Sequence, residues 1–276
     1  MKRFALIFTV LILFTSASLF AEEPFLKASL EAEFGTVKVF YHTYQVGENS
    51  SNFDFVKQGG QELLYPFQRY TVNLHLGGSH RLRFLYQPLQ LDTSITAKAD
   101  FTIDQTVFAA GTPVDLSYSF PFYRVSYMYD FIPGPVHAAA GLALQMRNAS
   151  IKFSSADGIQ RTVSQNLGPV PAFVLYGRLP FADIFFAELD ATGLWASSAI
   201  INGADFEFEG SILDASLRAG ALLRENTEVF LNLRFLGGTA KGTSQYESQY
   251  WTQSEEKYTA NYLATGSLTF GARLGL

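Results

Sequence analysis

Hydrophobic and polar residues alternate with a period of two along much of the chain. From residue 258 to residue 276, Tyr, Ala, Gly, Leu and Phe take every second position, and Thr, Asn, Ser and Arg hold most of the other face. This spacing is that of a β-strand with one apolar side, not of a helix. The same alternation occurs in residues 26–34, 68–76, 185–195, 213–222 and 228–235. The pattern predicts an all-β protein.

Two kinds of connection separate the alternating segments. Short turns rich in Gly, Pro and Asn are predicted at residues 77–80, 132–135, 179–183 and 224–227. Longer polar loops are predicted at residues 45–62, 92–112, 154–161, 197–205 and 237–256, with Gly237 and Gly238 ending a strand. Four short turns alternating with five loops predict ten strands with both termini on the short-turn side. Eight or twelve strands remain alternatives, because residues 94–108 can pair as an extra hairpin.

The N-terminal segment has the order of features typical of a secretory signal peptide. Lys2 and Arg3 precede an apolar run from Phe4 to Phe14, which small residues follow. We expect cleavage after Ala21, which leaves a single domain over residues 22–276. The apolar run is too short to span a bilayer as a helix.

Composition narrows the class further. Charged residues make up 16% of the chain, against roughly 25% in a soluble protein, while 48% of the residues are hydrophobic. This composition excludes a disordered chain, and the lack of Cys excludes a disulfide framework. A net charge of −5 argues against sequence-independent nucleic-acid binding, which needs a basic surface.

The polar strand faces carry few Lys residues and many isolated Arg, Asp and Glu residues. The water-facing side of a soluble sheet would be rich in Lys and Glu, so these faces are predicted to line the narrow lumen of a membrane barrel. Buried charges must be paired, and the guanidinium of Arg suits that task. The predicted lumen network comprises Arg69, Arg81, Arg83, Arg124, Arg178, Glu188, Asp190, Asp214, Arg218, Arg234 and Arg273, with Glu31 and Glu33 on the same kind of face.

Aromatic residues on one predicted strand are expected to mark the two membrane surfaces. Tyr118 and Phe120 lie near one end of this strand, and Tyr127, Tyr129 and Phe131 lie near the other. Eleven residues separate Tyr118 from Tyr129, and a tilted strand of that length spans roughly the ~25 Å between aromatic girdles.

With these features the chain resembles the bacterial outer-membrane β-barrel proteins over its whole predicted mature region. Residues 267–276 resemble the C-terminal strand that the barrel assembly machinery recognises, although the chain ends in Leu276 where such proteins most often end in Phe. The resemblance implies a closed, antiparallel, up-and-down transmembrane barrel with short periplasmic turns and longer extracellular loops. It also implies export to the bacterial outer membrane, contact with outer-membrane lipid, and a partner in the barrel assembly machinery. We expect a monomer.

The leading functional hypothesis is a barrel with a structural or interaction role and a polar lumen plugged by side chains. A narrow channel for small solutes or ions is the main alternative, and a soluble, lipocalin-like β-protein is another. An outer-leaflet lipid-modifying enzyme or protease is disfavoured, because His75, His80 and His137 flank short turns and only His42 is expected near the loops. We therefore predict no catalytic residues, no cofactor and no metal site.

Three pairs of carboxylates lie two residues apart on single strand faces. The pairs are Glu31/Glu33, Glu188/Asp190 and Glu207/Glu209. This spacing suits a general acid and base, but any polar lumen face also produces it, and we interpret the pairs as lumen residues. Glu207 and Glu209, beside a loop, are the candidates for contact with a cation.

Overall fold

The computed structural model describes residues 25–132, 136–197, 208–245 and 256–276. The predicted signal peptide, the Pro-Gly-Pro turn at residues 133–135 and Glu207 lie outside this part of the chain. Within these segments no helix is long and apolar enough to cross a membrane.

The described chain is built from β-strands of two kinds. The strands of the main wall are β1 (Leu26–Val46), β3 (Leu64–Leu76), β4 (His80–Gln87), β9 (Phe122–Ile132), β10 (His137–Ser155), β11 (Arg161–Phe181), β12 (Phe185–Ser197), β13 (Phe208–Arg224), β14 (Thr227–Gln245) and β15 (Glu256–Gly275). Shorter strands lie at one end: β2 (Phe53–Asp54), β5 (Gln90–Thr96), β6 (Phe101–Ile103), β7 (Thr106–Phe108) and β8 (Pro113–Ser119).

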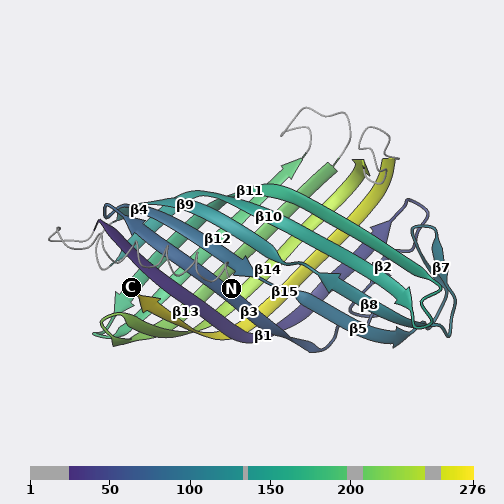
Figure 1. Cartoon of the computed structure of the whole chain (residues 1–276), viewed down its shortest axis with the longest axis horizontal. Helices are drawn as coiled ribbons and strands as arrows, with labels where there is room; N and C mark the ends of the chain where they lie inside the picture. Colours follow the sequence, from purple (N-terminus) through teal and green to yellow (C-terminus); the bar gives the residue numbers. More distant parts are fainter. Residues whose placement is uncertain (1–24, 133–135, 198–207, 246–255) are drawn as a thin grey trace, which may run out of the picture.

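The ten wall strands close into an antiparallel barrel (Figure 1). Each strand pairs with its neighbours in sequence, and β1 pairs with β15 along most of its length, from Ser29 opposite Gly275 to Val46 opposite Thr259. The part of the wall nearer the short turns is here called the lower part, and the part nearer the short strands β2 and β5–β8 is called the upper part. Closure leaves no free edge over the lower part, and a β-sheet that spans lipid must have no free edge. The prediction of a ten-stranded up-and-down barrel is confirmed.

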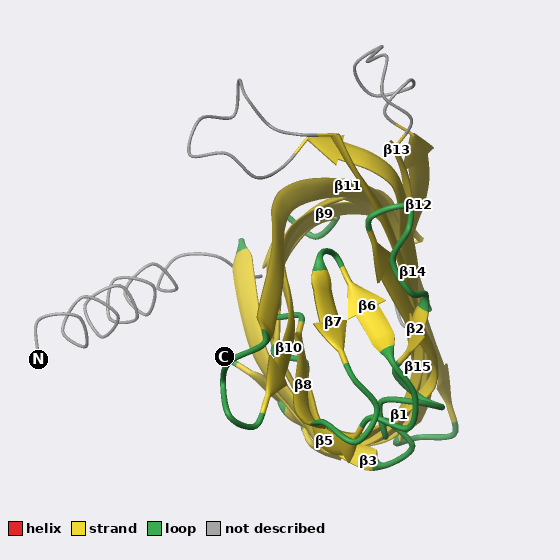
Figure 2. Cartoon of the chain, turned by 90° about the vertical axis from the view of Figure 1, so that its right-hand side faces the viewer, coloured by secondary structure: helices red, strands yellow, loops and turns green. Residues whose placement is uncertain are grey.

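The short strands extend one side of the barrel beyond the wall. Pro88 and Pro121 interrupt a long hairpin, so that β4 pairs with β9 below the prolines and β5 pairs with β8 above them. Proline has no N–H to donate to a ladder, which accounts for the break. Residues 101–108 form the β6–β7 hairpin, which lies within the ring of strands in the end view (Figure 2). The segment expected as one polar loop at 92–112 is therefore largely paired.

The predicted strand end at Gly237 and Gly238 is wrong. β14 continues through both glycines to Gln245, and Gly238 pairs with Ile212 on one side and Leu263 on the other. A Cβ added to Gly238 would lie 2.7 Å from the backbone oxygen of Ser211. These glycines permit close packing inside a strand and do not end it.

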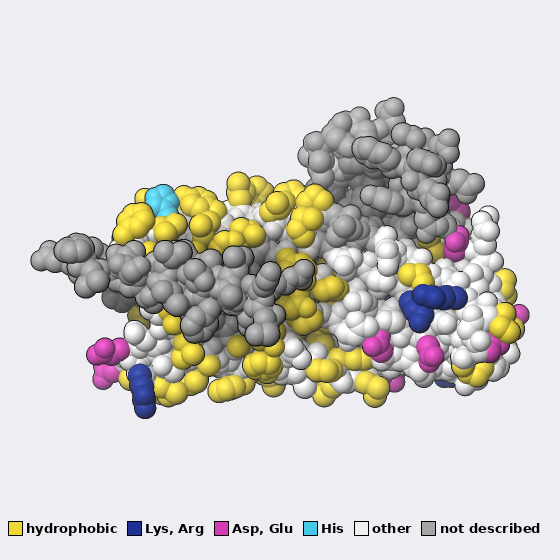
Figure 3. Space-filling model, viewed as in Figure 1, with side chains coloured by type: hydrophobic (Ala, Val, Ile, Leu, Met, Phe, Trp, Pro, Cys, Tyr) yellow, Lys and Arg dark blue, Asp and Glu magenta, His cyan; other side chains and the backbone are white. Residues whose placement is uncertain are grey.

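The lower part of the barrel is apolar outside and polar inside. Leu217, Leu231 and Leu268 are 58%, 59% and 56% exposed, whereas the intervening Arg218 and Arg234 are buried. The space-filling view shows hydrophobic side chains gathered at the end of the barrel that carries β4 and β9 (Figure 3). This polarity is that of a transmembrane barrel.

The extension has the opposite polarity. Its interior is a cluster, here called the aromatic core, in which Phe153 lies within 5.1 Å of Phe53 and 5.3 Å of Phe55 between ring centroids. Its members include Tyr44, Phe53, Phe55, Tyr65, Phe67, Leu89, Leu91, Phe101, Phe108, Tyr118 and Phe153. The exterior of this end is mostly polar (Figure 3).

The proposed girdle at Tyr118 and Phe120 is wrong. Both side chains point inward, with 2% and 7% exposure, and Tyr118 packs on His42. An odd separation such as that from Tyr118 to Tyr129 places two residues on opposite faces of a strand. The outward aromatics at this level are instead Tyr70, Tyr86 and Tyr123, cross-strand neighbours whose rings stack in a row. We call them the tyrosine row.

Candidate functional site in the charged lumen

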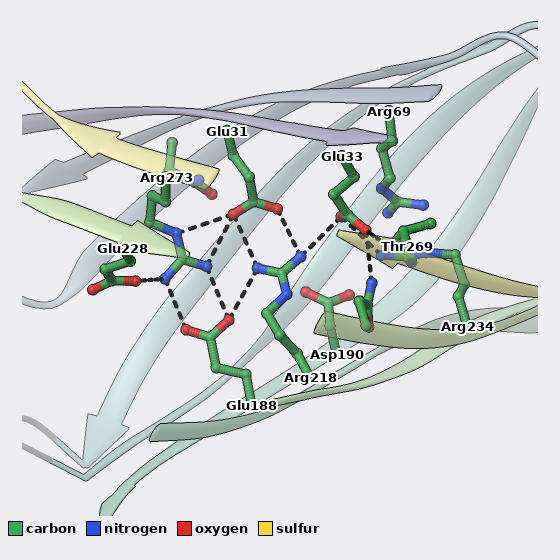
Figure 4. A network of polar contacts seen from close by, with 12 residues as sticks. Glu31, Glu33, Arg69, Glu188, Asp190, Arg218, Glu228, Arg234, Thr269 and Arg273 are labelled. Carbon is green, nitrogen blue, oxygen red and sulfur yellow. Dashed lines mark hydrogen bonds and ion pairs between the residues drawn. The ribbon is translucent and has the colours of Figure 1, made fainter. Parts of the chain in front are cut away.

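Alternation along the wall strands places one set of side chains in the lumen. On β1 the inward residues below the extension are Glu31 and Glu33, and on β13 they include Asp214 and Arg218. Because neighbouring strands share a register, inward residues from several strands meet at the same height. The structure places all eleven residues of the predicted network in this interior, where each of them makes an ion pair. Figure 4 shows the part of the network around Arg218 and Arg273.

Arg218 lies at the centre of the group nearest the short turns. Its Nη2 donates to Glu31 Oε1 at 2.7 Å and to Glu33 Oε1 at 2.9 Å, and its Nη1 donates to Glu188 Oε2 at 3.1 Å. The guanidinium carbon also lies 3.7 Å from the ring centroid of Phe230, a cation–π contact. One arginine thus connects β1, β12 and β13 across the lumen.

Arg273 and Arg178 extend this group toward the barrel end. Arg273 donates to Glu31 at 3.0 Å, to Glu188 at 2.8 Å and to Glu228 at 2.8 Å. Arg178 donates to Glu188 at 2.7 Å and to Glu228 at 2.9 Å. Each carboxylate therefore meets more than one guanidinium, and the charges neutralise one another.

A second group surrounds Asp214, which is fully buried. Its two oxygens accept from Arg69 at 2.9 Å, from Arg124 at 2.8 Å and from Arg234 at 2.7 Å. Arg234 reaches Glu33 as well, at 3.3 Å, and so joins this group to the first.

Uncharged side chains satisfy much of the remaining bonding capacity. Gln87 accepts from Arg69 at 2.8 Å, and Gln145 accepts from both Nε and Nη2 of Arg124 at 3.1 and 2.7 Å. Asn232 and Thr269 donate to Glu33 at 2.7 and 2.9 Å. Buried ions are costly unless such partners are present.

Two further pairs line the wall beside β11. Arg81 donates to both oxygens of Asp130, at 3.0 and 3.1 Å, and Arg83 pairs with Asp190. Both guanidiniums lie near the Tyr176 ring, the nearer at 4.4 Å from its centroid. Asp130 and Glu228 were not singled out from the sequence, although each falls on the inward parity of its strand.

Among the described residues, the network combines eight arginines with seven carboxylates. The arginines are Arg69, Arg81, Arg83, Arg124, Arg178, Arg218, Arg234 and Arg273. The carboxylates are Glu31, Glu33, Asp130, Glu188, Asp190, Asp214 and Glu228. The near balance of charge gives the lumen no strong preference for an anion or a cation.

One cavity among these side chains is small. A cavity of about 20 Å³ lies among Glu31, Arg69, Glu188 and Arg218. That volume holds about one water molecule.

The four histidines do not share a site. His80 is exposed and contacts the Tyr127 hydroxyl at 2.7 Å, while His75 and His137 lie toward the short turns, opposite Arg81 and Arg178 in the ladders. His42 is fully buried in the aromatic core, with Nδ1 2.7 Å from Gln61 Oε1 and its ring stacked on Phe55. Among the residues that the structure describes, no three His, Asp or Glu side chains gather as metal ligands would.

The third carboxylate pair is only partly described. Glu209 is exposed on β13 opposite Lys241, and it takes no part in the lumen groups above. Glu31, Glu33, Glu188 and Asp190 are all engaged by arginines. A carboxylate whose oxygens already accept from guanidiniums is poorly placed to take a proton from a substrate.

Comparison with known proteins gives structural likeness only. No protein-family model and no curated protein matches the sequence. The outer membrane protease OmpT of Escherichia coli is similar at a TM-score of 0.49 and 9% identity, with 91% of this chain and 97% of that chain covered. OprG of Pseudomonas aeruginosa is similar at a TM-score of 0.36 and 9% identity, with 90% of this chain and 95% of that chain covered. Ail of Yersinia pestis is similar at a TM-score of 0.32 and 8% identity, with 91% of this chain and 99% of that chain covered. Likeness at this level does not extend to activity, substrate or partner.

Proposed function

We propose that this chain is an integral outer-membrane barrel with a structural or interaction role, and that its own side chains close the membrane-spanning lumen. The extension then serves as the surface that the barrel holds above the bilayer. The observation that supports the proposal is the ion-paired lumen, in which the cavity among Glu31, Arg69, Glu188 and Arg218 measures about 20 Å³. A hydrated solute needs far more room than one water molecule occupies.

Planar-bilayer recording tests the closed lumen. The wild-type protein is expected to give no steady conductance. The double variant Glu31→Ser/Arg218→Ser removes one positive and one negative side chain from the lining of this cavity, so it is expected to conduct and to show that the assay can detect an opening. Heat-modifiable migration on a detergent gel checks that both proteins are folded. Steady wild-type conductance that changes in Arg124→Ala or Arg218→Ala would favour the channel alternative.

We further propose that the protein is exported with cleavage after Ala21 and inserted by the barrel assembly machinery as a monomer surrounded by outer-membrane lipid. The outward row of Leu268, Phe270 and Leu274 on β15 supports this, because it supplies the apolar face that both lipid and a recognition strand require. Cell fractionation should place the full-length chain with the outer membrane and should not place a chain lacking residues 267–276 there. Recovery of the intact chain in the aqueous phase without detergent would instead support a soluble, lipocalin-like protein.

A non-catalytic role is part of the same proposal. His42, the candidate on the loop side, has its ring between Phe55 and Tyr118 and one nitrogen on Gln61, and its other ring nitrogen has no hydrogen-bond partner among the described residues. Nucleophilic catalysis needs a base within hydrogen-bond reach of a nucleophile. Ester or peptide hydrolysis by the purified barrel that His42→Ala abolishes would overturn this part of the proposal.

A further inference from the structure

Above the tyrosine row, the barrel wall has an interruption between β3 and β5. The last rung between β3 and β4 is Tyr70 opposite Tyr86. Above it, β3 pairs only with β1, and β5 pairs only with β8. In the described part of the chain, the facing edges of β3 and β5 therefore have no ladder between them.

Residues 55–62, here called the stopper segment, fill this interruption. On one side they follow β2, which pairs with β1, and Phe55 N donates to the His42 oxygen at 2.9 Å. On the other side, the Thr93 hydroxyl of β5 donates to the Gly59 oxygen at 2.6 Å. The segment is thus attached firmly to β1 and only lightly to β5.

The interruption connects a lipid-level surface with the aromatic core. Leu63 and Leu64, at its mouth, are 63% and 64% exposed, and the lipid-facing Phe34 and Tyr70 lie just below. The inward residues along its two edges are Tyr65 and Phe67 on β3 and Leu89 and Leu91 beside and on β5, and all four belong to the aromatic core. Exposed apolar residues at such an edge mark a contact site for an apolar partner.

Unpartnered polar atoms lie inside this otherwise apolar region. His42 and Gln61 are fully buried, yet among the described residues neither His42 Nε2, nor Gln61 Nε2, nor the Tyr65 hydroxyl has a hydrogen-bond partner. Buried polar groups normally have a partner, so these atoms point to a molecule that brings one. Because Gln61 Oε1 accepts from His42 Nδ1, His42 Nε2 is left as an acceptor beside the amide donor of Gln61. A carboxylic acid offers a matching donor and acceptor.

We propose that the interruption between β3 and β5 is a lateral entrance, and that a long-chain fatty acid enters the aromatic core through it from the outer leaflet when the stopper segment moves away from β5. The acyl chain takes the place of the Phe55 ring, and the carboxylic acid group meets His42 and Gln61. A phospholipid does not enter, because its charged headgroup finds no ionic partner there. The charged lumen below is not part of this path.

An engineered disulfide tests the entrance directly. The chain contains no Cys, and a Cβ added to Gly60 lies 4.0 Å from Thr93 Cβ, within the usual range of roughly 3.5–4.5 Å for a disulfide. The Gly60→Cys/Thr93→Cys variant, in lipid nanodiscs, is irradiated with a diazirine-bearing long-chain fatty acid, and the labelled peptides are mapped. The reduced form is expected to carry label on aromatic-core peptides, and the oxidised form is expected to lose it. Reduction should restore it.

Comparison of the two redox states of one protein controls for strain at Gly60, whose φ is +73°. Each single-Cys variant should label equally under both conditions. Equal interior labelling of the oxidised and reduced double variant would overturn the proposal, as would label confined to the lipid-facing belt. Interior labelling by a matching diazirine phospholipid would overturn the choice of a fatty acid.

A second variant keeps the test valid if the double variant does not fold. Leu64→Asp places a charge at the mouth of the entrance on an exposed side chain near the membrane surface, where an added carboxylate costs about 1 kcal/mol or less, so the barrel should still fold. It is expected to lose interior labelling by the fatty acid. Ile159→Asp, at a residue 83% exposed in the turn between β10 and β11, is the matched control and should label like wild type. Unchanged interior labelling of Leu64→Asp would contradict the entrance.

Discussion

The lower and upper halves of strand β10 have opposite polarity although their register is the same. In the lower half Leu142, Leu144 and Met146 face outward and Gln145 faces inward. In the upper half Ser150, Lys152 and Ser154 face outward and Ile151 and Phe153 face inward. Even positions point outward in both halves. The surrounding medium, lipid below and water above, therefore decides which kind of residue each face carries.

The two halves are also held together by different forces. The upper half is stabilised by burial of the aromatic core, as in a soluble protein. Hydrophobic burial cannot stabilise the lower half in the same way, because lipid already surrounds its apolar side. There the packing of ionic and polar side chains fills the interior, and each ion depends on its partners.

The largest expected effect comes from removing the carboxylate at the centre of the lower half. Asp214→Ala leaves Arg69, Arg124 and Arg234 facing one another without their shared acceptor. Breaking a buried ion pair typically costs ~3–5 kcal/mol of unfolding free energy, and three arginines depend on this one. Urea unfolding of the folded, heat-modifiable form in lipid vesicles measures it.

Asp183→Ala, in the exposed turn between β11 and β12, is the control for Asp214→Ala and should leave stability unchanged. If Asp214→Ala lowered the unfolding free energy no more than Asp183→Ala does, ion pairing would not be what stabilises the lower half.

A loss of stability of similar size, but confined to the extension, is expected from truncating a side chain in the upper half. Phe153→Ala removes the ring that contacts Phe53, Phe55, Phe101 and Phe108, and truncating a buried Phe costs ~3 kcal/mol or more. Because the extension lies outside the lipid belt, the loss should appear as faster proteolysis of the extension while the barrel still migrates as folded on a gel. If Phe153→Ala made the extension sensitive to protease and also abolished the folded migration of the barrel, the two halves would unfold as one unit.

A smaller effect is expected from adding one charge to the outer surface of each half. Leu231→Arg puts a cation on the lipid face, which costs ~2–4 kcal/mol near the bilayer midplane. Thr96→Arg adds the same side chain to an exposed position of β5, where surface substitutions change stability by about 0.5 kcal/mol or less. Folding yields into vesicles compare the two. Equal yields would contradict the assignment of the lipid belt.

The smallest expected effect is a change in the pKa of Asp157, in the turn between β10 and β11. Asp157 accepts from the Ser155 hydroxyl at 2.5 Å and from the Ile159 amide at 3.0 Å, and these hydrogen bonds lower the pKa of its exposed carboxyl. A pKa lower in the folded state means that the carboxylate stabilises the turn above its unfolded pKa. That stabilisation is lost as pH falls through the folded pKa. NMR titration should give a midpoint below that of an unstructured Asp, and Ser155→Ala should raise it.

Local periodicity predicted the strands, their number and their inward faces, because a period of two depends only on neighbouring residues. It failed for Gly237 and Gly238, where glycine serves a close approach to another strand, and for Tyr118, where an odd separation from Tyr129 was overlooked. The partners within the lumen could not be predicted. Arg218 meets Glu31 because the closed barrel brings distant strands together across its axis, and no local pattern encodes that distance.

The seam between β1 and β15 joins the two ends of the sequence, and the Leu276 amide donates to the Ala28 oxygen at 2.9 Å. Such contacts cannot form on a partly synthesised chain, and ladders between remote segments are slow to form. Until the last strand arrives, β1 presents an unsatisfied edge that favours aggregation. Delivery to the membrane therefore has to keep the nascent polypeptide extended and shielded until β15 is available to pair with β1.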